Sequence, residues 1–165
     1  MLALLALVAV VAIGWALVTL LSAVRARKAQ SATQGRFEDY LLHALVNAAK
    51  IDGRIHETER AAIAQSLAAA GAPAEPAALD AAFAEAKLSK AELVAYLTAR
   101  AGHFTQAQKM TLLKALMAVF VADGAFNEAE HAALIDYTAA VGFDRTSAPE
   151  TLRQVGAQMR RGSII

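Results

Sequence analysis

The sequence predicts an all-α protein, with one N-terminal transmembrane helix and a cytoplasmic helical domain of about seven helices that contains two pseudo-symmetric helical hairpins. First, Ala, Leu, Glu and other strong helix formers dominate the 165 residues, with only three prolines and no alternating run of β-branched residues. Second, residues 2–24 form an unbroken apolar run without a charged side chain. Third, a helical pattern in the remainder occurs twice, displaced by 71 residues.

The apolar run is long enough to cross a bilayer. As a helix it would span roughly 34 Å, against a hydrocarbon core of about 30 Å. A cleaved signal peptide is the alternative, but the run lacks a basic segment before it, exceeds the usual length and has no convincing cleavage site, so we favour a retained anchor. Arg25, Arg27 and Lys28 follow at once. Because basic flanks stay on the cytoplasmic side, residues 1–28 predict a single-pass anchor in the inner (cytoplasmic) membrane, with the N-terminus outside.

Composition excludes several classes of function. The net charge of +1 provides no broad basic field, so no nucleic-acid partner is expected. The absence of cysteine excludes disulfides, thiol catalysis and cysteine-based metal sites. His43 and His103 have no catalytic neighbours in sequence, and no nucleophile elbow, phosphate loop or dinucleotide fingerprint occurs. We therefore expect a protein that is not an enzyme. We interpret three of its basic residues, Lys109, Arg145 and Arg153, as scattered surface charges.

Residues 29–35 are polar and lack an apolar stripe, which predicts a linker ahead of a domain over residues 36–145. Within that domain Leu41-Leu-His-Ala-Leu45 repeats as Leu112-Leu-Lys-Ala-Leu116, and Asp52-Gly53 repeats as Asp123-Gly124. Each copy predicts a helix, a tight turn and a second helix. His56 and Asn127 take the N-cap position, and the second helices end at glycines, Gly71 and Gly142.

Helix-start signals mark the remaining elements in order. One helix begins near Pro76 and runs to about Ala86, and another follows Ser89-Lys-Ala-Glu92 and runs to about Ala101. Thr105-x-x-Gln108 begins the long helix of the second copy. Ser147-x-x-Glu150 begins a short helix in a C-terminal helix and tail over residues 146–165. Because neither hairpin can bury its apolar face alone, the two should pack together as one core.

The turn motifs carry a family resemblance. Residues 50–60 and 121–130 each hold Asp-Gly-x-apolar-x-x-x-Glu, which resembles the doubled motif of the TerB-like (tellurite-resistance) superfamily, whose members include the amino-terminal domain of DjlA-type co-chaperones. The similarity covers roughly residues 36–145. No His-Pro-Asp tripeptide and no J domain follow, so stimulation of Hsp70 is not implied. The resemblance implies an all-α interaction domain linked to envelope or metal stress, sometimes with an acidic metal-binding patch.

Four acids are the candidate metal ligands, Asp52, Glu59, Asp123 and Glu130. If the two turns converge, their oxygens could bind a divalent cation such as calcium or magnesium. Ordinary turn and capping roles account for the same residues without an ion, and we favour that interpretation. Glu128 and His131 have the Glu-x-x-His spacing of di-iron bundles, but the required second pair is absent, which indicates a solvated first turn.

We therefore expect a non-enzymatic, membrane-anchored interaction domain whose partners are the lipid bilayer and another protein. The alternative is an accessory or assembly subunit of an integral membrane complex, with the anchor helix making the main contact. An exposed apolar patch on the domain would support the first hypothesis. Packing of residues 2–24 against other membrane helices would support the second.

Overall fold

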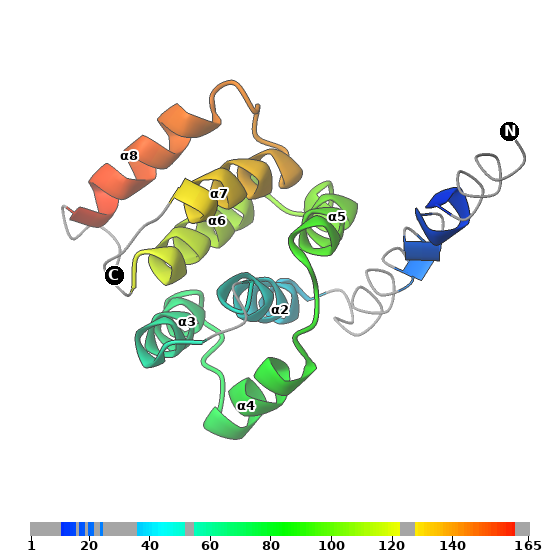
Figure 1. Cartoon of the computed structure of the whole chain (residues 1–165). Helices are drawn as coiled ribbons and strands as arrows, with labels where there is room; N and C mark the ends of the chain where they lie inside the picture. The colour runs from blue at the N-terminus through cyan, green and yellow to red at the C-terminus, as the bar shows by residue number, and fades with distance from the viewer. Residues whose placement is uncertain are drawn as a thin grey trace, which may run out of the picture.

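A computed structural model describes residues 11–15, 17–18, 20–21, 24, 36–51, 55–122 and 128–160, with side chains up to residue 157. Every regular element in these residues is helical, which confirms the all-α prediction. The predicted linker over residues 29–35 and both Asp-Gly turns, at Asp52 and Asp123, lie outside the described residues. Figure 1 shows seven labelled helices gathered into one bundle. Their bounds are α2 (Phe37–Ala49), α3 (Glu57–Ala69), α4 (Pro76–Glu85), α5 (Lys90–Ala101), α6 (Gln106–Phe120), α7 (Glu128–Ala140) and α8 (Ala148–Arg160).

The bundle is built around α2, which packs against α3, α4, α5 and α6 (Figure 1). On the other side of α6, α7 packs against α5, α6 and α8. The core is continuous from α2 to α8, and its fully buried side chains are mostly leucines and tyrosines. The two hairpins α2–α3 and α6–α7 thus share one core, as their apolar faces require.

The sequence repeat is reproduced in the structure. Helix α7 lies 71 residues after α3 at both of its ends, and α6 ends 71 residues after α2 ends. Paired core positions such as Ile63 and Leu134 are both fully buried.

The second helix of each hairpin ends in the same way. At Gly71, whose φ is 79°, the amide of Ala72 donates to the carbonyl of Leu67 at 2.9 Å. At Gly142, whose φ is 93°, the amide of Phe143 donates to the carbonyl of Thr138 at 3.2 Å. Both are Schellman motifs, in which the positive φ of glycine lets the chain turn back and satisfy the last carbonyls.

Capping boxes fix the starts of α5 and α6 as predicted. The Ser89 amide donates to Glu92 Oε2 at 2.8 Å, and the Thr105 amide donates to Gln108 Oε1 at 2.9 Å. Helix α8 has 13 residues, so the short terminal helix expected after Ser147 is wrong in length. Its amphipathic sequence buries Leu152 and Val155 against the bundle, and this packing sustains the additional turns.

The described residues of the N-terminal segment are helical and lie apart from the bundle (Figure 1). Most of the anchor predicted over residues 1–28 lies outside the described residues. Among the residues that are described, no helix is both long enough and apolar enough to cross a membrane. Eight large apolar side chains of this segment are 54–74% exposed, namely Val11, Ile13, Trp15, Leu17, Val18, Leu20, Leu21 and Val24.

Candidate functional site

Glu59 has the capping role that the sequence indicated. Its Oε2 accepts a hydrogen bond of 2.7 Å from the His56 amide at the start of α3, and the side chain is buried. A carboxylate at this position satisfies a free amide and interacts with the positive end of the helix dipole.

Of the other three candidate metal ligands, only Glu130 lies in the described part of the chain. Asp52 and Asp123 lie outside the described residues, as does Asn127, the expected capping partner of Glu130. Glu130 lies half-buried in the first turn of α7. Among the described residues, no group of three or more His, Cys, Asp or Glu side chains is arranged to hold a metal ion. The divalent-cation site stays a prediction.

A different cluster of charges joins α5 to the end of α7. Asp136 Oδ2 lies 2.8 Å from Lys90 Nζ, and Asp136 Oδ1 accepts a hydrogen bond of 2.7 Å from Arg145 Nη2. The hydrogen bond from Lys90 and the positive charges of both partners lower the pKa of Asp136 below its ordinary value. One carboxylate thus contacts two cations, and Asp144 adds a second carboxylate in the turn that holds Arg145.

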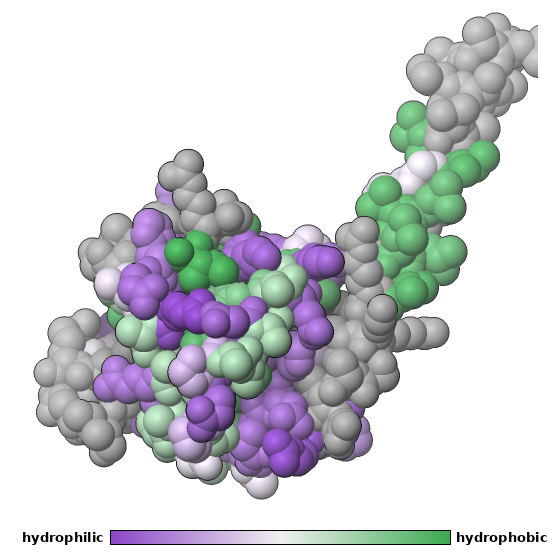
Figure 2. All heavy atoms as spheres, turned by 90° about the horizontal axis from the view of Figure 1, so that it is seen from below, coloured by the Kyte–Doolittle hydropathy of each residue, from purple (hydrophilic) through white to green (hydrophobic). Residues whose placement is uncertain are grey.

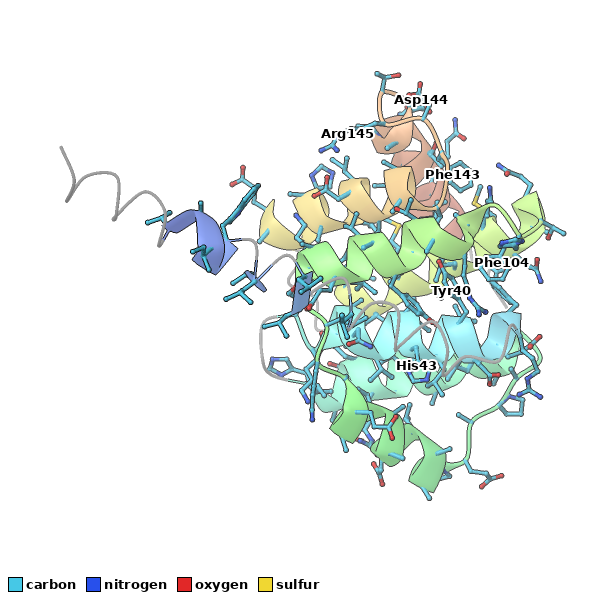
Figure 3. The ribbon with its side chains drawn as sticks, turned by 90° about the vertical axis from the view of Figure 1, so that its right-hand side faces the viewer. Tyr40, His43, Phe104, Phe143, Asp144 and Arg145 are labelled. Atoms are coloured by element: carbon cyan, nitrogen blue, oxygen red, sulfur yellow. The ribbon has the colours of Figure 1, made fainter. Side chains whose placement is uncertain are left out.

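Local structure places each member of this cluster. Lys90 is the first residue of α5, directly after the Ser89 capping box. Arg145 follows the Schellman turn at Gly142, which returns the chain alongside α7. Asp144 then accepts hydrogen bonds from the Thr146 amide and hydroxyl, and the hydroxyl bond is the main cause of its lowered pKa. Figure 3 shows Phe143, Asp144 and Arg145 together in this turn.

The charge cluster lies at a groove between α5 and α7. We call this the α5–α7 groove; its volume is about 650 Å³. Its floor consists of small side chains, Ala91, Val94 and Thr98 from α5 with Ala139 and Ala140 from α7. Lys90, Asp136 and Arg145 complete the lining. Apolar floor and charged groups together suit a ligand that is apolar along one face and anionic at one point.

A second cavity of about 260 Å³ lies where α2, α4 and α5 meet. Its polar groups already serve the fold. Asn47 accepts a hydrogen bond of 2.9 Å from the Leu88 amide, and Lys50 Nζ donates to the Phe83 carbonyl at 3.1 Å. We assign this cavity a structural role, because its polar side chains tie the α4–α5 connection to α2.

At the other end of α5, aromatic packing fixes the start of α2. The rings of Tyr40 and Phe104 lie 4.6 Å apart, the Tyr40 and Tyr96 rings stack at 5.0 Å, and the Tyr40 hydroxyl donates to the Leu97 carbonyl at 3.0 Å. Figure 3 shows Tyr40 and Phe104 near one another, with His43 further along α2. The first helix of the bundle is therefore held firmly against α5.

Sequence reasoning missed the three charged residues of the groove. Arg145 was expected to be an isolated surface charge, whereas it pairs with Asp136, and Lys90 and Asp136 were not singled out at all. Lys90 and Asp136 lie far apart in sequence, so no local spacing marks them as a pair. The only available signal was the glycine at 142, which predicts that the chain turns back after α7.

Comparison with known proteins identifies the helical domain. The family model described as tellurite resistance protein TerB matches residues 38–151, which span all of the bundle except the start of α2 and most of α8. No curated protein and no solved structure matches the chain.

Proposed function

Since the chain belongs to the TerB family, we propose that it is a membrane-tethered, non-enzymatic TerB domain that binds a partner protein at the cytoplasmic face of the inner membrane. The observation that carries the tether is the set of eight exposed large apolar side chains between residues 11 and 24. Full burial of such side chains is worth about 1.5–3 kcal/mol each, so leaving all eight in water costs on the order of 10 kcal/mol or more. An apolar environment is therefore the favoured location for this segment.

The described surface of the bundle lacks the exposed apolar patch that would have supported the domain as the main contact. Outside residues 11–24, Val121 has the only exposed large apolar side chain in the described residues, at 37%. Figure 2 shows the same contrast, with mixed polar and apolar side chains over the bundle and apolar ones along the described N-terminal residues. Since the described bundle surface has no large apolar patch, its partner surface has to be small or partly charged.

The same contrast favours a second candidate function. In an accessory or assembly subunit of an integral membrane complex, the N-terminal helix would contact other membrane helices. The concentration of exposed apolar side chains in residues 11–24 supports this alternative. The link to envelope or metal stress stays a prediction from the family resemblance.

Extraction of membranes with alkaline carbonate tests the tether. The unaltered full chain should stay in the membrane pellet. Each lysine placed at the centre of a membrane helix costs roughly 3 kcal/mol. Val11 and Ile13 lie near the middle of residues 2–24, so the double variant Val11→Lys, Ile13→Lys should shift largely to the supernatant. Val121→Lys is the matched control and should behave as the unaltered chain. Complete extraction of the unaltered chain would contradict the proposed tether.

Orientation can be measured with a single cysteine, because the chain has none of its own. Glu57 is exposed at the start of α3, so Glu57→Cys should be accessible without disturbing the core. A membrane-impermeant maleimide should label it only after spheroplasts are permeabilised. Labelling in intact spheroplasts would reverse the proposed topology.

Photo-crosslinking separates the two candidate functions. A crosslinking amino acid at Thr98, on the bundle, should capture a protein partner if the domain makes the main contact. The same amino acid at Leu17 should capture one if the anchor helix does.

A further inference from the structure

The α5–α7 groove has two partly exposed cationic side chains at one end. The Arg145 side chain is 70% exposed and that of Lys90 is 42% exposed, although both contact Asp136. A guanidinium has five N–H donors, and the contact with Asp136 leaves most of them facing solvent. A planar guanidinium beside an ammonium is well suited to bind a second carboxylate.

The groove also has the length of two helical turns. Ala91, Val94 and Thr98 recur at three- and four-residue steps along α5, and the stretch from Lys90 to Thr98 covers about 12 Å. Opposite them, the α7 side of the groove is lined by the small side chains of Ala139 and Ala140. Small side chains on both walls let a third helix approach closely and pack its ridge of side chains between α5 and α7.

We propose that the α5–α7 groove binds an amphipathic helix of a partner protein, with small apolar side chains on the floor and an Asp or Glu at the Lys90–Arg145 end. This inference rests on the proposed function and names the surface of the bundle that performs it. It uses the helix-in-groove mode of recognition, in which apolar anchors recur at helical spacing.

Because the groove is open to solvent, it favours a peptide over a lipid as the occupant. Ala91 and Thr98 of its floor are exposed, so the groove is shallow and an occupant keeps one face in water. An amphipathic helix has a polar face for that purpose. An acyl chain would keep much of its apolar surface hydrated and gain little from binding.

Selection from a phage-displayed library of random 14-residue peptides tests the proposal. The full chain in lipid nanodiscs is the target, and empty nanodiscs remove lipid binders. Enriched peptides should carry an acidic residue beside apolar residues at helical spacing. Enrichment of basic peptides, or no enrichment, would overturn the proposal.

Charge variants then show whether the selected peptides use the groove. Arg145→Glu should weaken binding by about fivefold to twentyfold. Asp136→Asn removes the competing carboxylate and should strengthen binding by about twofold to fivefold, on the scale of exposed charge pairs. Changes of opposite sign are the critical result, because a purely structural role would weaken binding in both variants. Arg153→Glu, at an exposed position of α8, is the charge-matched control and should leave affinity unchanged.

A dye on Ala95→Cys, an exposed residue of α5 next to the groove lining, distinguishes the occupants. The selected peptide should change its fluorescence with saturation, whereas vesicles containing brominated anionic lipid should not quench it. Quenching by the brominated lipid in place of a peptide response would make a lipid the occupant and overturn the proposal. A chain that stays in the carbonate pellet but binds no peptide refutes the groove alone. A chain that binds peptide but is extracted by carbonate refutes the tether alone.

Discussion

Three glycines permit a direct test of how the two hairpins end. Gly71 and Gly142 have φ values of 79° and 93°, whereas Gly102, after α5, has a φ of −66°. A methyl group at Gly71 or Gly102 would meet no atom within 4 Å. At Gly142 it would lie 3.2 Å from Lys109 Nζ, the end of a flexible side chain that can move aside. The three Gly→Ala variants therefore differ mainly in backbone conformation.

The magnitudes follow from two opposing terms. Alanine in the left-handed region costs about 1–2 kcal/mol. Replacing glycine also removes unfolded-state entropy, which stabilises the protein by about 0.4–1 kcal/mol. Gly71→Ala and Gly142→Ala should therefore each lower the free energy of unfolding by up to about 1.6 kcal/mol. Gly102→Ala avoids the first term and should raise it by several tenths of a kcal/mol.

Urea denaturation of the full chain in mild detergent, followed by circular dichroism, measures the three effects. Far-ultraviolet ellipticity is the suitable signal, because the only tryptophan, Trp15, lies outside the bundle. Thermal midpoints should shift by about 3–5 °C per kcal/mol. A loss of stability in Gly102→Ala equal to that in Gly71→Ala would refute the argument from φ.

The remaining predictions concern buried hydroxyls, pH and metal ions. Tyr40→Phe should lower the free energy of unfolding by about 1 kcal/mol because it removes the buried hydrogen bond from the Tyr40 hydroxyl to the Leu97 carbonyl of α5. Tyr137→Phe should be neutral or stabilising because its buried hydroxyl has no partner in the described residues, and denaturation of both variants checks this. Because the pKa of Asp136 is lowered on folding, its ionised carboxylate stabilises the folded state above the ordinary carboxyl pKa, and this contribution should be lost as the pH falls through the lowered pKa. Acid denaturation of the unaltered chain and of Asp136→Asn measures the contribution. It should amount to about 1 kcal/mol or less and should shrink in salt. If the acids only cap and turn, calcium, magnesium and zinc should leave thermal midpoints unchanged in both the unaltered chain and Asp123→Asn; a rise in the unaltered chain that the variant loses would establish an ion site.

The parts of the fold that local chemistry determines could be predicted from the sequence. Gly71 and Gly142 share a role because each ends the second helix of a hairpin in the same hydrogen-bonded motif. Ser89 and Thr105 begin helices because each lies three residues before a side chain that can bond back to its amide. Such signals operate within a few residues, so a single sequence reveals them.

The α5–α7 groove could not be predicted in this way. Its charges come from the start of α5, the middle of α7 and the turn beyond it, and they meet only after α5 packs against α7. Periodicity reports which face of a helix is buried but not which neighbour covers it. The metal site predicted from the sequence, in contrast, was chosen because the same acids occur in both copies of the repeat. Of those acids, Glu59 is described with its hydrogen bond, and that bond gives it a capping role.

The groove arises where the two copies of the repeat differ. Asp136 and Arg145 of the second copy correspond to Gln65 and Ala74 of the first, so the charge cluster is specific to one hairpin. The elements outside the repeat add to this asymmetry: α2 of the first hairpin packs against α4 and α5, whereas α7 of the second packs against α5 and α8. Residues shared by both copies build the common core, because each hairpin must bury its apolar face against the other. Residues that differ between the copies are free of that constraint, and in this protein they supply the only surface of the described bundle for which we propose a partner.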